Sequence, residues 1–587
     1  MKKLFLFAMA VATLSGCSSS EDLELQSEVK AGGEGYVSFS IQLPTTNSSA
    51  TRANDKFEDG DPVPDEYKVN NATMFIFKGS TEADAKFVSA YAMNVNTFKA
   101  DGTPTDQCTT EGIVSSKITK PEINSGEKIY AYVMINSNDM INTTAKTIDG
   151  NSYDGMTFEN FSKLKLSKVG NLTNGMVMTN APVASKMGGA SDPTGATLTT
   201  LTKLDPNKIF ATQAAAEANP AGDVYMERAA VKVTVKTASL SGTITTPGES
   251  VTYNAASIKW ALSNVNTQYY NTRQMKESWL GYHAQGDGTN AIIEGTPTAL
   301  YRFVSGAAIH GGIYRTYWGE DVNYDTDATT FATLGAVDKN PDESVYTFEN
   351  TFDVDHQVAK NTTGVAVSAT FNDGKSFYTA STYGDNKILQ EPTSSVSGEK
   401  IQEYIMTYLC NNYSKFKAWY DNNANNRITV TMDNSDATNA TVTAVTKATG
   451  AEDLPSDFGQ TEIKDALNSI TFKYYNGGVA YYNVLIKHFG DFETPWDRKN
   501  HTENSITGVY KKINGTTLTN EQSDNNYLGR YGVVRNNWYQ IEITDIRQIG
   551  SPVIVTPSTD PDDNVDNYLS VKIHITPWAV RKQSVIL

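Results

Sequence analysis

The feature that most constrains the fold of this 587-residue chain is a recurring alternation of apolar and polar residues in short segments. It is clearest in residues 36–43, where every second side chain is apolar: Val37, Phe39, Ile41 and Leu43. A period of two is typical of a β-strand with one buried face. Similar segments follow between turn-rich stretches, at residues 72–77, 128–135, 230–235, 365–371, 427–431 and 571–575. Because few helical patterns separate them, the sequence predicts an all-β protein made of sandwiches.

Two segments depart from this pattern. Between residues 399 and 419 apolar side chains recur at helical spacing, and they are Ile401, Tyr404, Ile405, Tyr408 and Leu409. A shorter helix is predicted around residues 211–218. We expect both helices to be insertions that pack against a sheet.

The length of the chain exceeds what one hydrophobic core usually serves, so at least two domains are expected. A Ser/Gly/Thr/Pro-rich stretch at 239–250 predicts the boundary, with an N-terminal domain at 53–245 and a C-terminal domain at 246–577. A Pro/Asp-rich stretch at 556–567 contains Asp560, Asp562, Asp563 and Asp566. It lacks the spacing of an EF-hand, so a solvated turn is favoured over a calcium loop.

The charge balance excludes one class of partner. Lys and Arg number 49 against 66 Asp and Glu, a net charge of −17, and no basic cluster occurs that would bind nucleic acid. This acidity suits a protein that must stay dissolved outside the cell. Of the three cysteines, Cys108 and Cys410 lie far apart, so we expect both to be free thiols.

No motif of an enzyme, cofactor site or metal site is found. The segment Gly374-Lys375-Ser376 ends like a phosphate-binding loop, but Ala369 stands where that loop needs glycine, so a hairpin turn is favoured. His488 and His574 lie in strand-like runs and are expected to be structural. A distant carboxylate pair for glycoside hydrolysis stays open, as does a glycan-binding surface formed by some of the 31 tyrosines.

The N-terminus has the pattern of a removable leader. Lys2 and Lys3 precede an apolar run that ends in Leu14-Ser15-Gly16-Cys17, which resembles the bacterial lipobox. The resemblance implies that residues 1–17 are a signal peptide and that Cys17 is acylated. No later run is long enough to cross a bilayer, so membrane attachment depends on the precursor lipid alone.

Several blocks taken together resemble the Bacteroidetes fimbrilins, the type V pilins, and most closely the major subunit of the short fimbriae. The blocks are residues 225–233, 346–352, 481–488 and 529–539. In the first block we expect Glu227 and Arg228 to face solvent at the start of a strand. In the last block we expect Trp538 to anchor the core.

The resemblance implies two transthyretin-like Greek-key β-sandwich domains with short helical insertions. It also implies a precursor anchored in the outer membrane, whose propeptide at 18–52 carries the removable strand 36–43. An Arg-specific protease is expected to cut between Arg52 and Ala53, which leaves a gap that a strand of another subunit fills. Arg52 is the sole Lys or Arg between Lys30 and Lys56.

The donor of that strand is expected to be the C-terminal tail, residues 578–587. Its apolar members are Trp578, Val580, Val585, Ile586 and Leu587. Burying four such side chains contributes about 6–12 kcal/mol before ordering costs. A head-to-tail contact of this kind does not close, so it builds a filament.

The sequence therefore predicts a structural stalk subunit of a cell-surface fimbria, without catalysis or cofactor. Its expected partners are other copies of itself, anchor and tip subunits, the protease, and host or bacterial surface ligands. The alternative is a surface lipoprotein that binds glycans, keeps Cys17 and does not polymerise. In that case residues 36–43 are an ordinary first strand.

Overall fold

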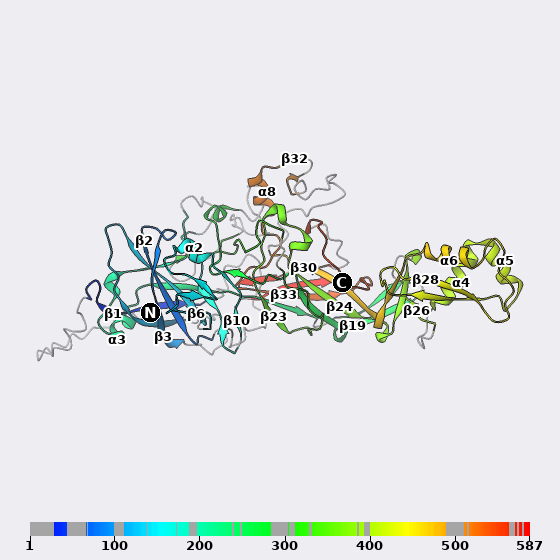
Figure 1. Cartoon of the computed structure of the whole chain (residues 1–587), viewed down its shortest axis with the longest axis horizontal. Coiled ribbons are helices and arrows are strands. Elements are labelled where there is room, and N and C mark those ends of the chain that lie inside the picture. The colour runs from blue at the N-terminus through cyan, green and yellow to red at the C-terminus, as the bar shows by residue number, and fades with distance from the viewer. Residues whose placement is uncertain are drawn as a thin grey trace, which may run out of the picture.

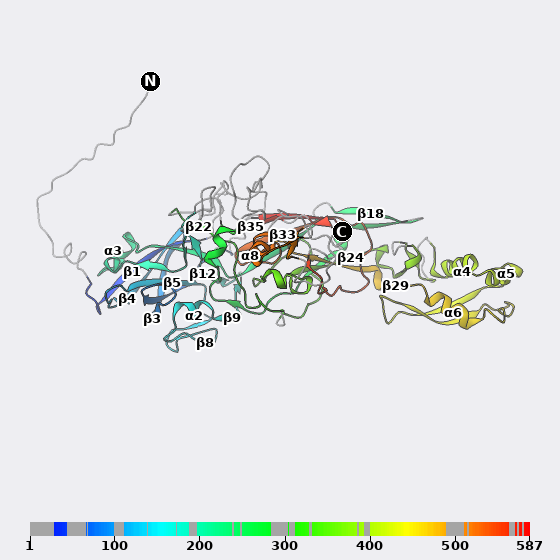
Figure 2. The ribbon, with the colours of Figure 1, turned by 90° about the horizontal axis from the view of Figure 1, so that it is seen from above.

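A computed structural model shows an elongated molecule, with an N-terminal domain at one end, a C-terminal domain in the middle and a smaller lobe at the other end (Figures 1 and 2). The structure describes residues 29–586 apart from several gaps. The longest gaps are 44–65, 99–110, 187–195, 283–302, 305–311, 393–398, 489–509 and 563–569.

The N-terminal sheet curls until it meets itself. Its order is β12-β16-β1-β4-β3-β2-β5-β15, and β12 also pairs with β5, so the strands form a ring. The ring encloses an apolar core, and a second cluster rich in aromatic residues covers the outer face of β2 and β5. The strands are β1 (Glu34–Gln42), β2 (Ala72–Gly79), β3 (Lys86–Phe98), β4 (Glu111–Thr119), β5 (Lys128–Ile135), β12 (Met178–Asn180), β15 (Thr202–Leu204) and β16 (Asp223–Arg228).

The C-terminal domain is a sandwich of two sheets. One has the order β23-β17-β33-β36-β34, with β35 also pairing with β33, and the other is β20-β24-β30. Apolar side chains from both sheets meet in the largest core cluster. The strands are β17 (Val231–Lys236), β20 (Ile258–Ser263), β23 (Ser344–Thr347), β24 (Gly364–Thr370), β30 (Val479–Leu485), β33 (Asn537–Asp545), β34 (Ser570–Val571), β35 (His574–Pro577) and β36 (Val580–Ile586). The predicted all-β class is confirmed.

Short elements surround these sheets. β18 (Ser241–Thr246) and β19 (Glu249–Asn254) form a hairpin, and α3 (Gln213–Ala218) is the short helix predicted near residue 211. The others are β6 (Ile141–Asn142), β7 (Thr147–Ile148), β8 (Asn151–Ser152), α2 (Phe158–Ser162), β9 (Lys165–Leu166), β10 (Gly170–Asn171), β11 (Gly175–Met176), β13 (Val183–Ala184), β14 (Leu198–Thr199), β21 (Tyr269–Tyr270), β22 (Tyr314–Arg315), β31 (Lys512–Ile513), β32 (Thr516–Thr517) and α8 (Asn520–Tyr527).

The chain passes from one sheet to the other between β16 and β17, at Ala229 and Ala230. This change of sheet lies upstream of the stretch at 239–250 in which the sequence places the domain boundary. The hairpin of β18 and β19 occupies most of that stretch instead. A turn-rich composition is therefore as consistent with a hairpin as it is with a linker.

The lobe at the far end is inserted between β25 (Phe377–Ala380) and β29 (Phe472–Tyr475) and has its own apolar core. The helix predicted within 399–419 is confirmed as α4 and α5, which are separated at Tyr413. The remaining elements are β26, β27, β28 and α6. Their bounds, with those of α4 and α5, are β26 (Leu389–Gln390), α4 (Ile401–Asn412), α5 (Ser414–Asn422), β27 (Ile428–Asp433), β28 (Thr441–Lys447) and α6 (Gln460–Asn468). No helix of the described residues is long and apolar enough to span a membrane.

The lobe's hairpin of β27 and β28 is closed at both edges by side-chain amides. Asn468 accepts from the Val442 backbone N–H at 2.8 Å and donates to the carbonyl of the same residue at 3.1 Å. On the other edge, the Gln402 amide donates to the Ile428 carbonyl at 2.7 Å. Each amide occupies the place of a neighbouring strand, so the hairpin does not offer these groups to another chain.

Replacing Asn468 with Ala is expected to make local opening of β28 easier by about 1–3 kcal/mol, because it leaves both backbone groups of Val442 without their partner. Hydrogen exchange of the β28 amides should accelerate roughly 5- to 150-fold, while exchange in β24 stays unchanged. Asn412→Ala is the control, since its exposed amide donates only to Tyr408 of its own helix. Equal effects of the two variants would contradict the edge role.

Candidate functional site: the seat of the first strand

Strand β1 lies inside the N-terminal ring and not at an edge. On one side it pairs antiparallel with β4 along its whole length, from Glu34 opposite Thr119 to Gln42 opposite Glu111. Each alternate residue therefore exchanges backbone hydrogen bonds with β4.

The other side of β1 is lined by several segments in turn. Tyr36 exchanges two backbone hydrogen bonds with Phe210, at 2.7 and 2.8 Å. Ala221 N–H donates to the Ser38 carbonyl, and Ser40 N–H donates to the Gly222 carbonyl. The last residues of β1 then pair parallel with β16. Removing β1 would leave unpaired backbone groups on both walls of the gap.

The inward face of β1 fills the core of the ring. Val37, Phe39 and Ile41 are fully buried and Leu43 is 1% exposed, as the alternation predicts. Burial of these side chains contributes about 6–12 kcal/mol at about 1.5–3 kcal/mol each. This contribution is comparable with the whole net stability of a typical domain, about 5–15 kcal/mol.

The outward face is also buried, which the pattern of serines does not indicate. Helix α3 lies against it, and the Ser38 hydroxyl donates to the Ala216 carbonyl at 2.6 Å. At the start of the strand, a Cβ on Gly35 would stand 2.7 Å from Ile209, so only glycine fits without a shift. The alanine-rich sequence of α3 is the signal that could have indicated such a close approach, since small side chains let a helix backbone come near a strand.

The other predicted site residues are placed as follows. Cys17, Arg52, Ala53, Trp578 and Leu587 lie outside the described residues. Val580, Val585 and Ile586 belong to β36, which pairs parallel with β33 and antiparallel with β34 of its own chain. The proposed tail is thus a strand within the C-terminal sheet, and its backbone lies between one parallel and one antiparallel neighbour, as β1 does.

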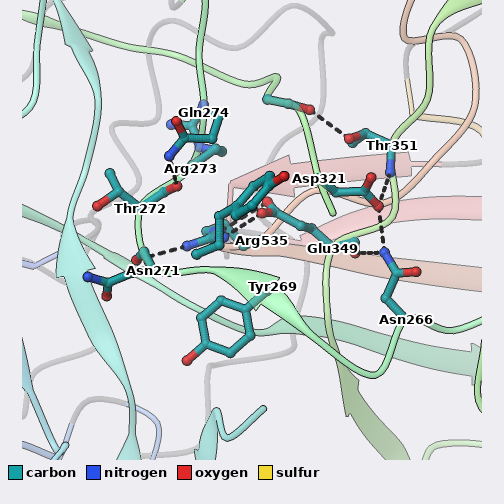
Figure 3. A network of polar contacts seen from close by, with 12 residues as sticks. Asn266, Tyr269, Asn271, Thr272, Arg273, Gln274, Asp321, Glu349, Thr351 and Arg535 are labelled. Atoms are coloured by element: carbon teal, nitrogen blue, oxygen red, sulfur yellow. Dashed lines mark hydrogen bonds and ion pairs between the residues drawn. The ribbon is translucent and has the colours of Figure 1, made fainter. Parts of the chain in front are cut away.

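Two buried ion pairs lie close to the end of β16, where the two domains meet. Glu227 and Arg228 are 3% and 0% exposed, so the prediction that they face solvent is wrong. Glu227 accepts from Arg273 at 2.9 Å, and Arg535 forms a second buried pair with Glu349 (Figure 3). Both charges of each pair leave water together, because a lone buried charge would be far more costly.

The same junction holds a carboxyl group with a shifted pKa. Asp321 accepts hydrogen bonds from the side chain of Asn266 and from the backbone N–H groups of Asn323 and Thr351. Burial raises the pKa of Asp321 to about 7 even though these donors oppose the shift. Trp538, expected as an anchor, is 5% exposed and donates to Thr234 at 2.9 Å.

Two segments considered for metal or phosphate chemistry have structural roles. Asp562 is fully buried and accepts from the Tyr510 hydroxyl at 2.6 Å, so the prediction of a solvated turn fails at this residue. Asp560 is exposed, and Asp563 and Asp566 lie outside the described residues. The end of the phosphate-loop-like segment is a turn between β24 and β25, but the prediction of a hairpin is wrong because these two strands belong to different sheets.

His488 and Cys410 also agree with expectation. His488 is buried between the Tyr539 hydroxyl at 2.7 Å and the Tyr317 carbonyl at 3.0 Å. Cys410 is a half-buried free thiol. Within the described ranges, no group of His, Cys, Asp and Glu has the arrangement of a metal site.

Comparison with known proteins finds a family match near the C-terminal end of the chain. Residues 509–584 match the family model described as major fimbrial subunit protein type IV, fimbrillin, C-terminal. This part of the chain is similar to the C-terminal region of the fimbrillins. The matched region contains β33, β34, β35 and most of β36. The predicted relationship to the fimbrilins is confirmed there. No curated protein matches the chain significantly.

Solved structures give weaker likenesses. A fimbrilin from Porphyromonas gingivalis W83 has 12% identity and a TM-score of 0.27, with 94% of this chain and 97% of that chain covered. The tip fimbrial protein Mfa3 from Porphyromonas gingivalis has 10% identity and a TM-score of 0.24, covering 90% and 99%. A fimbrial assembly protein from Parabacteroides distasonis has 12% identity and a TM-score of 0.24, covering 57% and 96%. These TM-scores lie below 0.5, so we rest no conclusion on them.

Replacing Phe39 with Ala is expected to destabilise the N-terminal ring by about 3–5 kcal/mol, because a buried aromatic side chain leaves a cavity. Hydrogen exchange should accelerate in β4 and β16 and stay slow in β24. The matched control is Val367→Ala in β24, which should act on the C-terminal sandwich and spare β4. If Phe39→Ala accelerates exchange equally in both domains, β1 does not stabilise the N-terminal ring specifically.

Proposed function

We propose that the protein is a stalk subunit of a cell-surface fimbria that polymerises by exchange of one strand after proteolysis. In this proposal, cleavage between Arg52 and Ala53 releases residues 36–43, and a strand of another copy enters the vacated seat. The observation that carries the proposal is the position of β1: it is paired on both sides and buried on both faces, and in the sequence it precedes Arg52.

The energetics favour replacement over an empty seat. Loss of the inward side chains of β1 removes about 6–12 kcal/mol of stabilisation. This amount is comparable with the net stability of a typical domain. The unpaired backbone groups of β4 and of residues 221–225 add to that cost. An incoming strand restores both contributions, and its own apolar side chains determine how well it fits.

The C-terminal tail at residues 578–587, which contains β36, is the proposed donor. In its own chain β36 has one parallel neighbour, β33, and one antiparallel neighbour, β34. The seat of β1 offers the same combination, with β16 parallel and β4 antiparallel. Donation requires β36 to leave β33 first, so the proposal makes polymerisation an exchange of one set of strand contacts for another.

The remaining parts of the proposal follow from this role. The precursor is a lipoprotein held at the outer membrane through Cys17, and the mature subunit lies in a surface filament with anchor and tip subunits. An Arg-specific surface protease is the trigger, and host or bacterial surfaces are the ligands. No catalytic activity, cofactor or nucleic acid belongs to the proposal.

Replacing Arg52 with Ala is expected to abolish formation of a mature N-terminus at Ala53, because the protease loses the side chain it recognises. Mass spectrometry of surface protein measures this directly. Lys56→Ala is the matched control and should leave processing unchanged, since it removes a neighbouring cation of the same segment. Mature protein that still carries acylated Cys17 and residues 36–43 would instead support the non-polymerising lipoprotein.

Deleting residues 578–587 is expected to give a subunit that folds and is cut but forms no filaments of its own, as seen by electron microscopy. Such a subunit keeps its seat, so it should accept a strand without donating one. Mixed in small amounts with intact subunits, it should shorten their filaments. Normal polymerisation of the deleted protein alone would contradict the donor assignment.

A further inference from the structure

Glu66 is held more firmly than its place in the sequence suggests. It follows the gap at 44–65, which contains Arg52, and precedes β2, which begins at Ala72. It is nevertheless fully buried, although a glutamate in a connecting segment is normally exposed.

Two residues of the C-terminal sheet and one residue of β16 in the N-terminal ring hold Glu66. The Glu66 carboxylate accepts from Lys232 Nζ at 2.6 Å and from the Tyr346 hydroxyl. Its carbonyl accepts from Arg228 Nε at 3.1 Å. The Lys232 ammonium also lies 3.8 Å from the ring centre of Trp538. Both the side chain and the main chain of Glu66 are therefore hydrogen-bonded, and we call these contacts the Glu66 seat.

Moving Glu66 out of the Glu66 seat is electrostatically unfavourable. Burial lowers the pKa of Lys232, and the Glu66 carboxylate opposes that shift. Burial and the hydrogen bond to Glu66 raise the pKa of Tyr346, so its hydroxyl keeps its proton as a donor. If Glu66 leaves, the Lys232 ammonium stays buried without its counter-charge.

Lys68 and Asn70 are hydrogen-bonded to Asn136 of the N-terminal domain. Asn136 donates to the Lys68 carbonyl at 2.7 Å and accepts from the Asn70 N–H at 2.8 Å. The chain from Glu66 to Asn70 thus bridges the two domains, with Glu66 as the most upstream of these described contacts. A protease that cuts between Glu66 and Asn70 must first break the contacts of this segment with both domains. The reason is that a protease active site binds several residues in extended form.

We propose that Glu66 is the positioning residue that marks where the removable part of the chain ends. A cut anywhere between Leu43 and Glu66 frees β1 and leaves the body intact, whereas the Glu66 seat keeps bonds further downstream from being cut. The inference rests on the proposed removal of β1, but it does not require Arg52 to be the natural cut site.

Two lysines flank the Glu66 seat and provide a matched pair of reporters. Lys56 lies in the segment before Glu66, and Lys68 lies directly after it. In the native full-length protein, lysyl endopeptidase should cut after Lys56 and produce an N-terminus at Phe57. Cutting after Lys68, which would produce an N-terminus at Val69, should be at least tenfold slower, as measured by mass spectrometry over time.

Glu66→Ala should raise the rate of cutting after Lys68 at least tenfold and leave the rate after Lys56 unchanged, because cleavage follows the population of the opened segment. Glu66→Gln should protect partly, since its amide oxygen still accepts from Lys232 and Tyr346. Glu399→Gln, which alters an ion pair with Lys387 in the distal lobe, is the control and should change neither rate.

The design separates local opening from unfolding and from failure of the proposed function. Cutting after Lys259, inside β20, reports global unfolding. If Glu66→Ala unfolds the protein, Tyr346→Phe removes one hydrogen bond from the same carboxylate and should raise cutting after Lys68 by a smaller factor.

Equal cutting after Lys56 and Lys68 in the native protein overturns the inference. So does a folded Glu66→Ala variant whose Lys68 stays resistant. A mature N-terminus that lies elsewhere between Leu43 and Glu66 overturns only the assignment of Arg52.

Discussion

The structure of the N-terminal domain depends on the backbone hydrogen bonds that β1 makes with both of its neighbours. In the closed ring β12-β16-β1-β4-β3-β2-β5 each strand pairs with a neighbour on both sides, and β15 adds to β5. Strand β1 does this with β4 on one side and with residues 210 and 221–225 on the other. It also fills the core with Phe39 and its neighbours on the same face. Among the described strands of the ring, β1 lies nearest the N-terminus of the chain.

The second constraint is electrostatic and acts where the domains meet. Glu227, Arg273, Glu349 and Arg535 are all buried there, and each carboxylate faces a guanidinium. A pair of this kind adds little net stability, but loss of one partner is costly, so the arrangement is specific. Glu66 and Lys232 repeat the principle nearby, and they connect the segment before β2 to the C-terminal sheet. The two domains are therefore joined by paired charges as well as by apolar contacts.

Much of the fold could be predicted from the sequence because the relevant signals are local. The alternation of Val37, Phe39, Ile41 and Leu43 correctly indicates a strand with a buried face, and the spacing of Ile401, Ile405 and Leu409 correctly indicates a helix. The matched region at 509–584 also lies where the motif around Trp538 suggests a relationship. The prediction failed where burial depends on a distant segment. Glu227 and Arg228 look exposed in their own strand, yet Arg273 and Asn536 reach them from elsewhere in the chain.

The sequence by itself determined the strand character of residues 36–43, the acidic charge and the single basic residue, Arg52, within residues 44–55. These follow from side-chain periodicity and composition, which need no knowledge of neighbours. Only the tertiary structure decided that β1 is an interior strand, that its serine face lies under α3, and that Glu66 is buried. The physical reason is that a period of two specifies which side chains share a face but not what covers either face. Pairing and burial are made by segments that lie far away in the sequence, so they exist only once the chain has folded.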